Sequence, residues 1–183
     1  MSEKHNHKLE ELTNNISHSL ENQAESSCEY MYSTSLMTPK ARQLAGVWKV
    51  TDHTVDGIPY ADVFALSSLK DTEHERLTYE ATYEFGGNLC IKRVLIYGSI
   101  IANGVKTDYE YRMSMVLTWE LGHDTISVLP VLAYQYTSLD GSPVSVRELP
   151  HSNFRIELKY TLDANSLILE DGTDVKKLER ERG

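Results

Sequence analysis

The chain has 183 residues, of which 40% are hydrophobic and 25% are charged, and its formal net charge is −9. This length and composition indicate one ordinary soluble domain. The acidic balance argues against nucleic acid and anionic membrane surfaces as partners, because both attract cationic proteins. No apolar run is long enough to span a membrane and no secretory signal is apparent, so we expect a cytoplasmic protein.

The N-terminal residues 1–37 differ from the rest of the chain, because they are rich in Ser, Asn and Glu. Leu9, Leu12, Ile16 and Leu20 recur at three- and four-residue spacing, which predicts one amphipathic helix. Its apolar stripe is narrow, so we expect a lid or docking segment and not a part of the core. It could cover the mouth of the following domain, its outer wall, or a second copy of the chain in a homodimer. Residues 38–183 would form the main domain.

From Leu44 onward, apolar and polar residues alternate with a period of two, which is typical of antiparallel strands with one buried face. Short turn signals separate the runs, for example Gly86-Gly87, Gly122-His123 and Asp171-Gly172. The pattern predicts eight strands, near residues 44–55, 76–85, 89–101, 106–121, 124–137, 153–162, 166–171 and 174–180. A meander of this length with one apolar face most simply closes into an eight-stranded, antiparallel, up-and-down β-barrel of the all-β class.

The assumed turns also predict which residues face each other. A two-residue turn at Gly122-His123 pairs Trp119 with Ile126, Met113 with Leu132, and Tyr111 with Tyr134. Every such pair is apolar or aromatic. The pairing therefore predicts a single apolar inner face.

A short helical turn at Thr38-Pro39 leads into Gly46-Val47-Trp48, seven further predicted strands follow, and the last strand ends in a basic residue. In these features, residues 38–181 resemble the lipocalin-like members of the calycin superfamily. The resemblance implies that Trp48 closes the floor of the barrel and that Arg180 packs across it, with Lys176 as a second choice. We expect Gly46 to let the chain approach Trp48 closely. A central family signature and a disulfide pair are absent, so the resemblance is to a divergent, bacterial-type lipocalin-like domain.

The two longest predicted connections, residues 56–75 and 138–152, would lie at the end opposite Trp48. That end is therefore the expected mouth of the barrel. Tyr109 and Tyr111 would begin one strand there, and Tyr134 and Tyr136 would end the next, with Phe154 nearby. These rings would suit a flat, partly polar ligand, or they could be packed core aromatics.

Lys92 is the sharpest candidate. Two-residue turns at both ends of its strand would point it inward, opposite Ala81 and Met115. A cation among apolar neighbours needs a carboxylate, a lowered pKa or an anionic ligand. Asp52, on the Trp48 side of the first strand, is a possible partner. A bulge near residues 85–89 would instead turn Lys92 outward.

Other reactive residue types form no recognisable set. We expect His53, His74, His123 and His151 in turns, in loops or on outer faces, so that no Ser-His-Asp or Cys-His arrangement forms. Cys28 and Cys90 are expected to be free thiols. No cluster has metal-ligand spacing, so we expect neither a metal nor a cofactor.

These features predict a protein that binds a small hydrophobic or aromatic molecule, with or without an acidic group, inside the barrel. One alternative is a cofactor-independent cyclase or isomerase that shapes a reactive substrate in the same pocket. A second is a filled barrel that acts through protein contacts. The candidate ligand-binding residues are Tyr79, Lys92, Tyr109, Tyr111, Met113, Met115, Leu132, Tyr134, Tyr136 and Phe154.

Overall fold

The computed structural model describes residues 38–70, 72–102, 104–149 and 154–181. The predicted N-terminal helix, and with it the lid and homodimer hypotheses, lies outside the described residues. So does Cys28. The domain boundary near residue 37 therefore stays a prediction.

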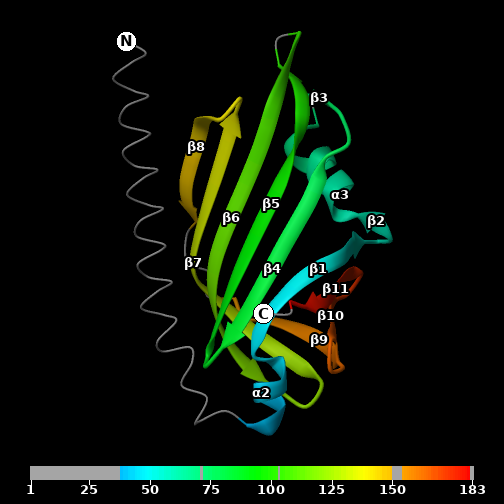
Figure 1. Cartoon of the computed structure of the whole chain (residues 1–183), viewed down its shortest axis with the longest axis vertical. Coiled ribbons are helices and arrows are strands. Elements are labelled where there is room, and N and C mark those ends of the chain that lie inside the picture. Colours follow the sequence, from blue (N-terminus) through cyan, green and yellow to red (C-terminus); the bar gives the residue numbers. More distant parts are fainter. Residues whose placement is uncertain (1–37, 71, 103, 150–153, 182–183) are drawn as a thin grey trace.

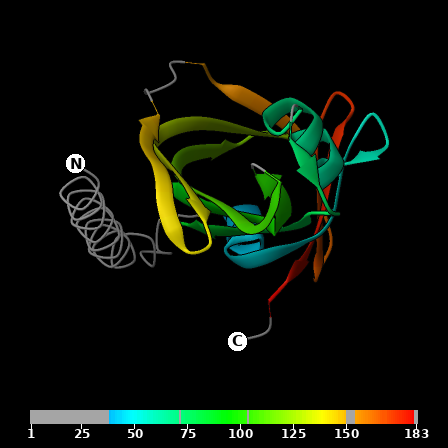
Figure 2. The same ribbon diagram turned by 90° about the horizontal axis from the view of Figure 1, so that it is seen from above.

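Eight antiparallel strands close into a barrel, as the sequence predicts (Figure 1). Around the barrel they are β1 (Gly46–Val55), β4 (Thr78–Gly86), β5 (Leu89–Ala102), β6 (Val105–Leu121), β7 (Thr125–Leu139), β9 (Ile156–Leu162), β10 (Ser166–Asp171) and β11 (Asp174–Arg180). Closure comes from the pairing of β11 with β1. Viewed from above, the strands surround a common interior (Figure 2).

The period-two pattern determines which side chains fill this interior. In β4, Ala81, Tyr83 and Phe85 are buried, whereas the intervening Thr82 and Glu84 are less so. The same alternation places one apolar side of each strand inside. Burial of each large apolar side chain stabilises the fold by about 1.5–3 kcal/mol. The interior side chains therefore form one continuous core.

The two long connections contain structure that the sequence analysis did not predict. The first holds β2 (Ile58–Pro59), α3 (Tyr60–Ser68) and β3 (Glu73–His74). The second, predicted as a loop, holds β8 (Ser142–Leu149). The loop prediction was wrong because Asp140-Gly141 forms a tight hairpin turn, with φ angles of 48° and 74°. Asp-Gly is a strong signal for such a turn, because both central residues need positive φ.

β7 changes partners halfway along its length. Residues 125–128 pair with β9, and residues 133–139 pair with β8. Between them, Leu129, Pro130 and Leu132 pair with β6 alone among the described strands. We call this stretch of β7, residues 129–132, the seam of the barrel wall, because it separates the part of β7 that pairs with β9 from the part that pairs with β8.

Trp48 and Arg180 form the floor of the barrel. The indole of Trp48 is fully buried, and its Nε1 donates a hydrogen bond of 2.7 Å to the Leu44 carbonyl at the end of α2 (Pro39–Leu44). The guanidinium of Arg180 lies 4.2 Å from the centre of the indole ring and donates to the Ala45 and Gln43 carbonyls. This is the arrangement that the resemblance implies. Lys176, the second choice, lies elsewhere.

Gly46 is favoured by its backbone conformation and by the same contact. A Cβ at this position would lie 2.9 Å from an Arg180 nitrogen, and the Gly46 φ of 125° is one that other residues rarely adopt. The Gly-x-Trp sequence is thus explained by the close approach of Arg180 to the chain.

We expect Trp48→Ala to lower the free energy of unfolding by about 3–5 kcal/mol, because it leaves a large cavity at the floor. Urea unfolding followed by circular dichroism measures this loss. Leu66→Ala is the matched control, since Leu66 is 68% exposed on α3 and its loss should change stability by less than about 0.5 kcal/mol. Equal stability of the two variants would show that Trp48 does not support the floor.

Candidate functional site

The barrel encloses a cavity of about 210 Å³. All eight barrel strands contribute to its lining, and Tyr60 of α3 contributes from above. Most of the lining is apolar, and the polar and charged members are His53, Lys92, Asp171, Asp174 and Lys176. The barrel is therefore not completely filled by side chains, and its mostly apolar lining contains charged groups.

A β-bulge in β1 places His53 in this cavity. Val50 pairs with Leu178 and Asp52 pairs with Lys177, so two residues of β1 correspond to one of β11 and Thr51 is the extra residue. The bulge turns Asp52 outward, where it forms an ion pair of 2.9 Å with Lys177. Two predictions were therefore wrong. Asp52 is not the partner of Lys92, and His53, expected on an outer face, is 7% exposed and lines the cavity.

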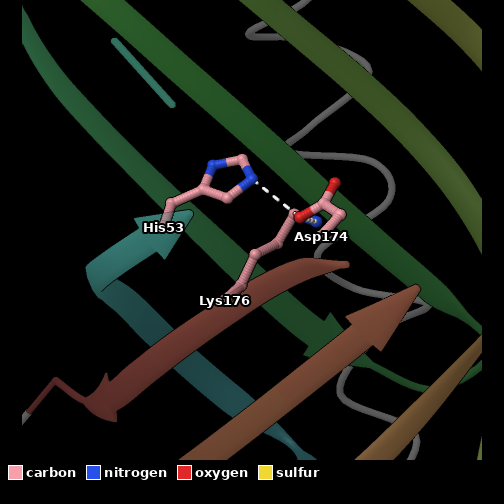
Figure 3. Close-up of polar contacts among 3 residues, drawn as sticks. All are labelled: His53, Asp174 and Lys176. Carbon is pink, nitrogen blue, oxygen red and sulfur yellow. Dashed lines mark hydrogen bonds and ion pairs between the residues drawn. The ribbon is translucent and has the colours of Figure 1, made fainter. Parts of the chain in front are cut away.

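His53, Asp174 and Lys176 form a connected polar group across β1 and β11 (Figure 3). One oxygen of Asp174, Oδ1, accepts a hydrogen bond of 2.8 Å from His53 Nε2 and one of 2.5 Å from Lys176 Nζ. The other His53 nitrogen, Nδ1, is buried without a partner among the described residues. Since an ionised carboxylate only accepts hydrogen bonds, Nε2 is the protonated nitrogen of His53.

Burial and hydrogen bonding shift the pKa values of Asp174 and His53 in opposite directions. Burial tends to raise the pKa of Asp174, but the hydrogen bonds from His53 and Lys176 outweigh it and lower the pKa to about 2. Burial lowers the pKa of His53, with the Asp174 bond opposing it. At neutral pH the group therefore contains an ionised Asp174 and a neutral His53.

Lys92 faces the cavity from β5, as the sequence predicts, and Met115 lies opposite it as expected. Its other neighbour is Tyr83 and not Ala81, because the β4–β5 turn lies at residues 87–88, one position later than predicted. That change shifts the pairing by two residues, so Lys92 still points inward. Its Nζ lies 5.5 Å from the centre of the Tyr83 ring.

The ammonium group of Lys92 has no carboxylate within ion-pairing distance among the described residues. Burial lowers the pKa of Lys92, while the more distant charge of Asp174 acts in the opposite direction. Lys176, in contrast, holds Asp174 directly. The cavity thus contains one lysine with a close counter-charge and one without.

Cys90 also lines the cavity, but its thiol is not a candidate nucleophile. The side chain is fully buried, and burial raises the pKa of the thiol well above its usual value. The reactive thiolate is therefore scarce at neutral pH.

α3 covers the part of the barrel that was predicted to be an open mouth. Tyr60 stacks on His53 with ring centres 4.1 Å apart, and Tyr79 lies 5.1 Å from both. Phe64 packs on Tyr111 at 4.9 Å. Of the predicted ligand-binding residues, Tyr79, Tyr109, Tyr111 and Met113 belong to the packed core, and only Lys92 and Met115 line the cavity.

A second bulge reverses the inner face of β7. The β6–β7 hairpin pairs Trp119 with Val128 and not with Ile126, and Val131 is then inserted opposite Val116 and Leu117. Beyond the bulge, Gln135 pairs with Met113 and hydrogen-bonds to Tyr111.

The predicted inward placement of three β7 residues was consequently wrong. Leu132, Tyr134 and Tyr136 lie on the opposite side of the strand from Gln135, away from the cavity. Phe154, which precedes β9, is 81% exposed. Pro130 was the signal that could have revealed the bulge, because a proline inside a strand marks a bulge or an edge.

The cavity reaches towards the surface at the β7 seam. Val128, Pro130 and Ile156 line it there, and Ile156 is 39% exposed. The cavity therefore lies next to the surface at the side of the barrel.

Comparison with models of protein families, with curated proteins and with solved structures finds no match for this chain. No helix in the described part of the chain is long and apolar enough to cross a membrane. Within the same residues, no group of three or more His, Cys, Asp or Glu side chains could hold a metal ion. The cavity itself is thus the feature from which a function has to be argued.

We expect Asp174→Asn to lower the free energy of unfolding at pH 7 by about 2–4 kcal/mol, because it leaves Lys176 buried without its carboxylate. The pKa of Asp174 is about 2 in the folded chain, below the ordinary value of about 3.9. Its stabilising effect is therefore complete above about pH 5 and is lost as the pH falls towards 2.

Urea unfolding at a series of pH values tests this dependence. The difference in stability between the parent and Asp174→Asn should narrow as the pH falls from about 5 towards 2. Asp52→Asn is the control, because Asp52 forms an exposed ion pair, which is worth about 0–1 kcal/mol. A difference that is constant across this range would contradict the assignment.

Proposed function

We propose that the protein binds a small, mostly apolar anion, of the size and kind of an aromatic carboxylate, in the barrel cavity. The observation that carries the proposal is Lys92, which faces the cavity without a carboxylate partner among the described residues. An anionic group on the ligand would supply the missing counter-charge. The resemblance of the chain to lipocalin-like domains supports the same reading.

The volume of the cavity limits the size of the ligand. An engineered protein cavity of about 150 Å³ holds a benzene molecule. The present cavity, at about 210 Å³, would accommodate one such ring with a carboxylate attached. Met115, Leu117 and Leu169 would contact the ring, since they contribute to the apolar part of the lining.

The charges of the cavity favour an anion over a neutral ligand. Lys92 and Lys176 are both present, and Asp174 already accepts hydrogen bonds from Lys176 and His53. Asp171, the other lining carboxylate, is exposed at the rim. In an interior of low dielectric, an uncompensated cation is costly, so a bound anion would be stabilised strongly.

The alternatives from the sequence are less well supported. A cyclase that folds a large precursor would need a pocket of roughly 300–1,000 Å³, as drug-sized ligands do. Proton transfer by His53 is disfavoured, because Nδ1, the nitrogen that does not donate to Asp174, is buried. A completely filled interaction module is disfavoured by the cavity.

Titration calorimetry with benzoate and with benzyl alcohol tests the proposal. The two compounds have similar shapes and differ in charge, so we expect benzoate to bind at least about tenfold more tightly. Lys92→Met should reduce benzoate affinity by about tenfold or more, because hydrogen bonds to charged groups contribute about 1.5–3 kcal/mol. It should leave benzyl alcohol binding unchanged.

Lys177→Met is the matched control, since Lys177 carries the same charge on the outer face and pairs with Asp52. It should retain the parental preference for benzoate. Thermal melting checks that Lys92→Met is folded, as expected when a buried charge is replaced by an apolar residue of similar volume. Equal affinity for the two compounds, or loss of benzoate binding in Lys177→Met alone, would overturn the proposal.

A further inference from the structure

We infer that Lys92 is also a nucleophile, which forms a Schiff base with small aldehydes and ketones that enter the cavity while no anion occupies it. This covalent chemistry goes beyond the reversible binding proposed above. It uses the uncharged form of the side chain, whereas anion binding uses the charged form. The two activities can therefore succeed or fail separately.

The surroundings of Lys92 are those of a reactive amine. Its side chain lines the cavity beside Met115 and Tyr83, and no carboxylate of the described residues holds the ammonium form by direct contact. A lysine desolvated in an apolar pocket, or placed near another cation, becomes a better nucleophile. The first condition is met here, because Lys92 is buried and most of the cavity lining around it is apolar.

Burial and the surrounding titratable groups shift the pKa of Lys92 in opposite directions, and burial is the stronger effect. Burial is the largest effect and lowers the pKa of Lys92, while Tyr60, Asp174 and Cys90 oppose it through more distant charges. His53 is neutral at pH 7 and adds no charge, because burial lowers its pKa as well. The uncharged fraction of Lys92 therefore exceeds that of an exposed lysine.

The reaction needs no component besides the carbonyl compound. The lone pair of Lys92 Nζ attacks the carbonyl carbon, the carbon–oxygen π bond opens, and the oxygen takes up the first amine proton to give a carbinolamine. The hydroxyl group then leaves as water, taking with it the second of the two protons that the amine carried. A carbon–nitrogen double bond remains. The apolar lining would slow the return of water and thus the hydrolysis of this imine.

Lys176 is the other lysine of the cavity, and it differs from Lys92 in having a close carboxylate partner. Its Nζ donates a hydrogen bond of 2.5 Å to Asp174, which holds the charged form. Attack by Lys176 would require this bond to break first. We therefore expect reaction at Lys92 and not at Lys176, although both line the cavity.

Reductive trapping tests the inference. The full-length protein is treated at pH 7 with benzaldehyde and sodium cyanoborohydride, which fixes an imine as a stable benzyl amine. Peptide mass spectrometry then gives the rate of labelling at each lysine. Only an uncharged amine reacts, and each unit of pKa lowering raises the uncharged fraction about tenfold. We expect labelling of Lys92 to be at least about fivefold faster than that of the exposed Lys177 and Lys106.

A parallel sample contains saturating benzoate, which should slow labelling at Lys92 and leave Lys177 unchanged. Fast labelling that benzoate does not slow would support the Schiff base and count against the anion site. Benzoate binding in calorimetry together with labelling of Lys92 no faster than Lys177 would overturn this inference alone. Lys92→Arg, which keeps the charge but cannot form an imine, should lose only the fast-labelled site.

Discussion

The pairing of β1 with β11 is the interaction on which the rest of the structure depends. It closes the barrel, and it places the floor and the polar group on one ladder. At one end, Trp48 lies opposite Arg180. Further along, His53 lies opposite Lys176, with Asp174 two residues away. The same ladder that excludes water at the floor thus assembles the charged side of the cavity.

The regular features of this barrel could be predicted from the sequence, whereas the bulges were missed, although Pro130 marks one of them. The alternation of apolar and polar residues predicts the strands, and β10 and β11 agree with the predicted ranges residue for residue. Lys92 could be placed inward because a hairpin shifted by two residues preserves the facing of every side chain. A bulge inserts one residue and therefore reverses the facing of the side chains beyond it. Thr51 brings His53 inside and sends Asp52 out, and nothing in the surrounding sequence marks that position.

The composition of the cavity shows where stability and function oppose each other. Lys176 and His53 are compensated by Asp174, but Lys92 is not, and an uncompensated charge in an apolar interior is unfavourable. An apolar residue at position 92 would pack with less cost. We infer that the cost is retained because the amine acts on what enters the cavity, either as a cation for an anion or as a nucleophile for a carbonyl.

Nuclear magnetic resonance of protein labelled with ¹⁵N at lysine Nζ measures the charge of the Lys92 amine directly. We expect Lys92 to titrate below the ordinary lysine pKa of about 10.4 in the free protein. Its pKa should rise when benzoate is bound, because a nearby anion favours the charged form. A Lys92 resonance that titrates like those of surface lysines, and that benzoate leaves unchanged, would contradict the account.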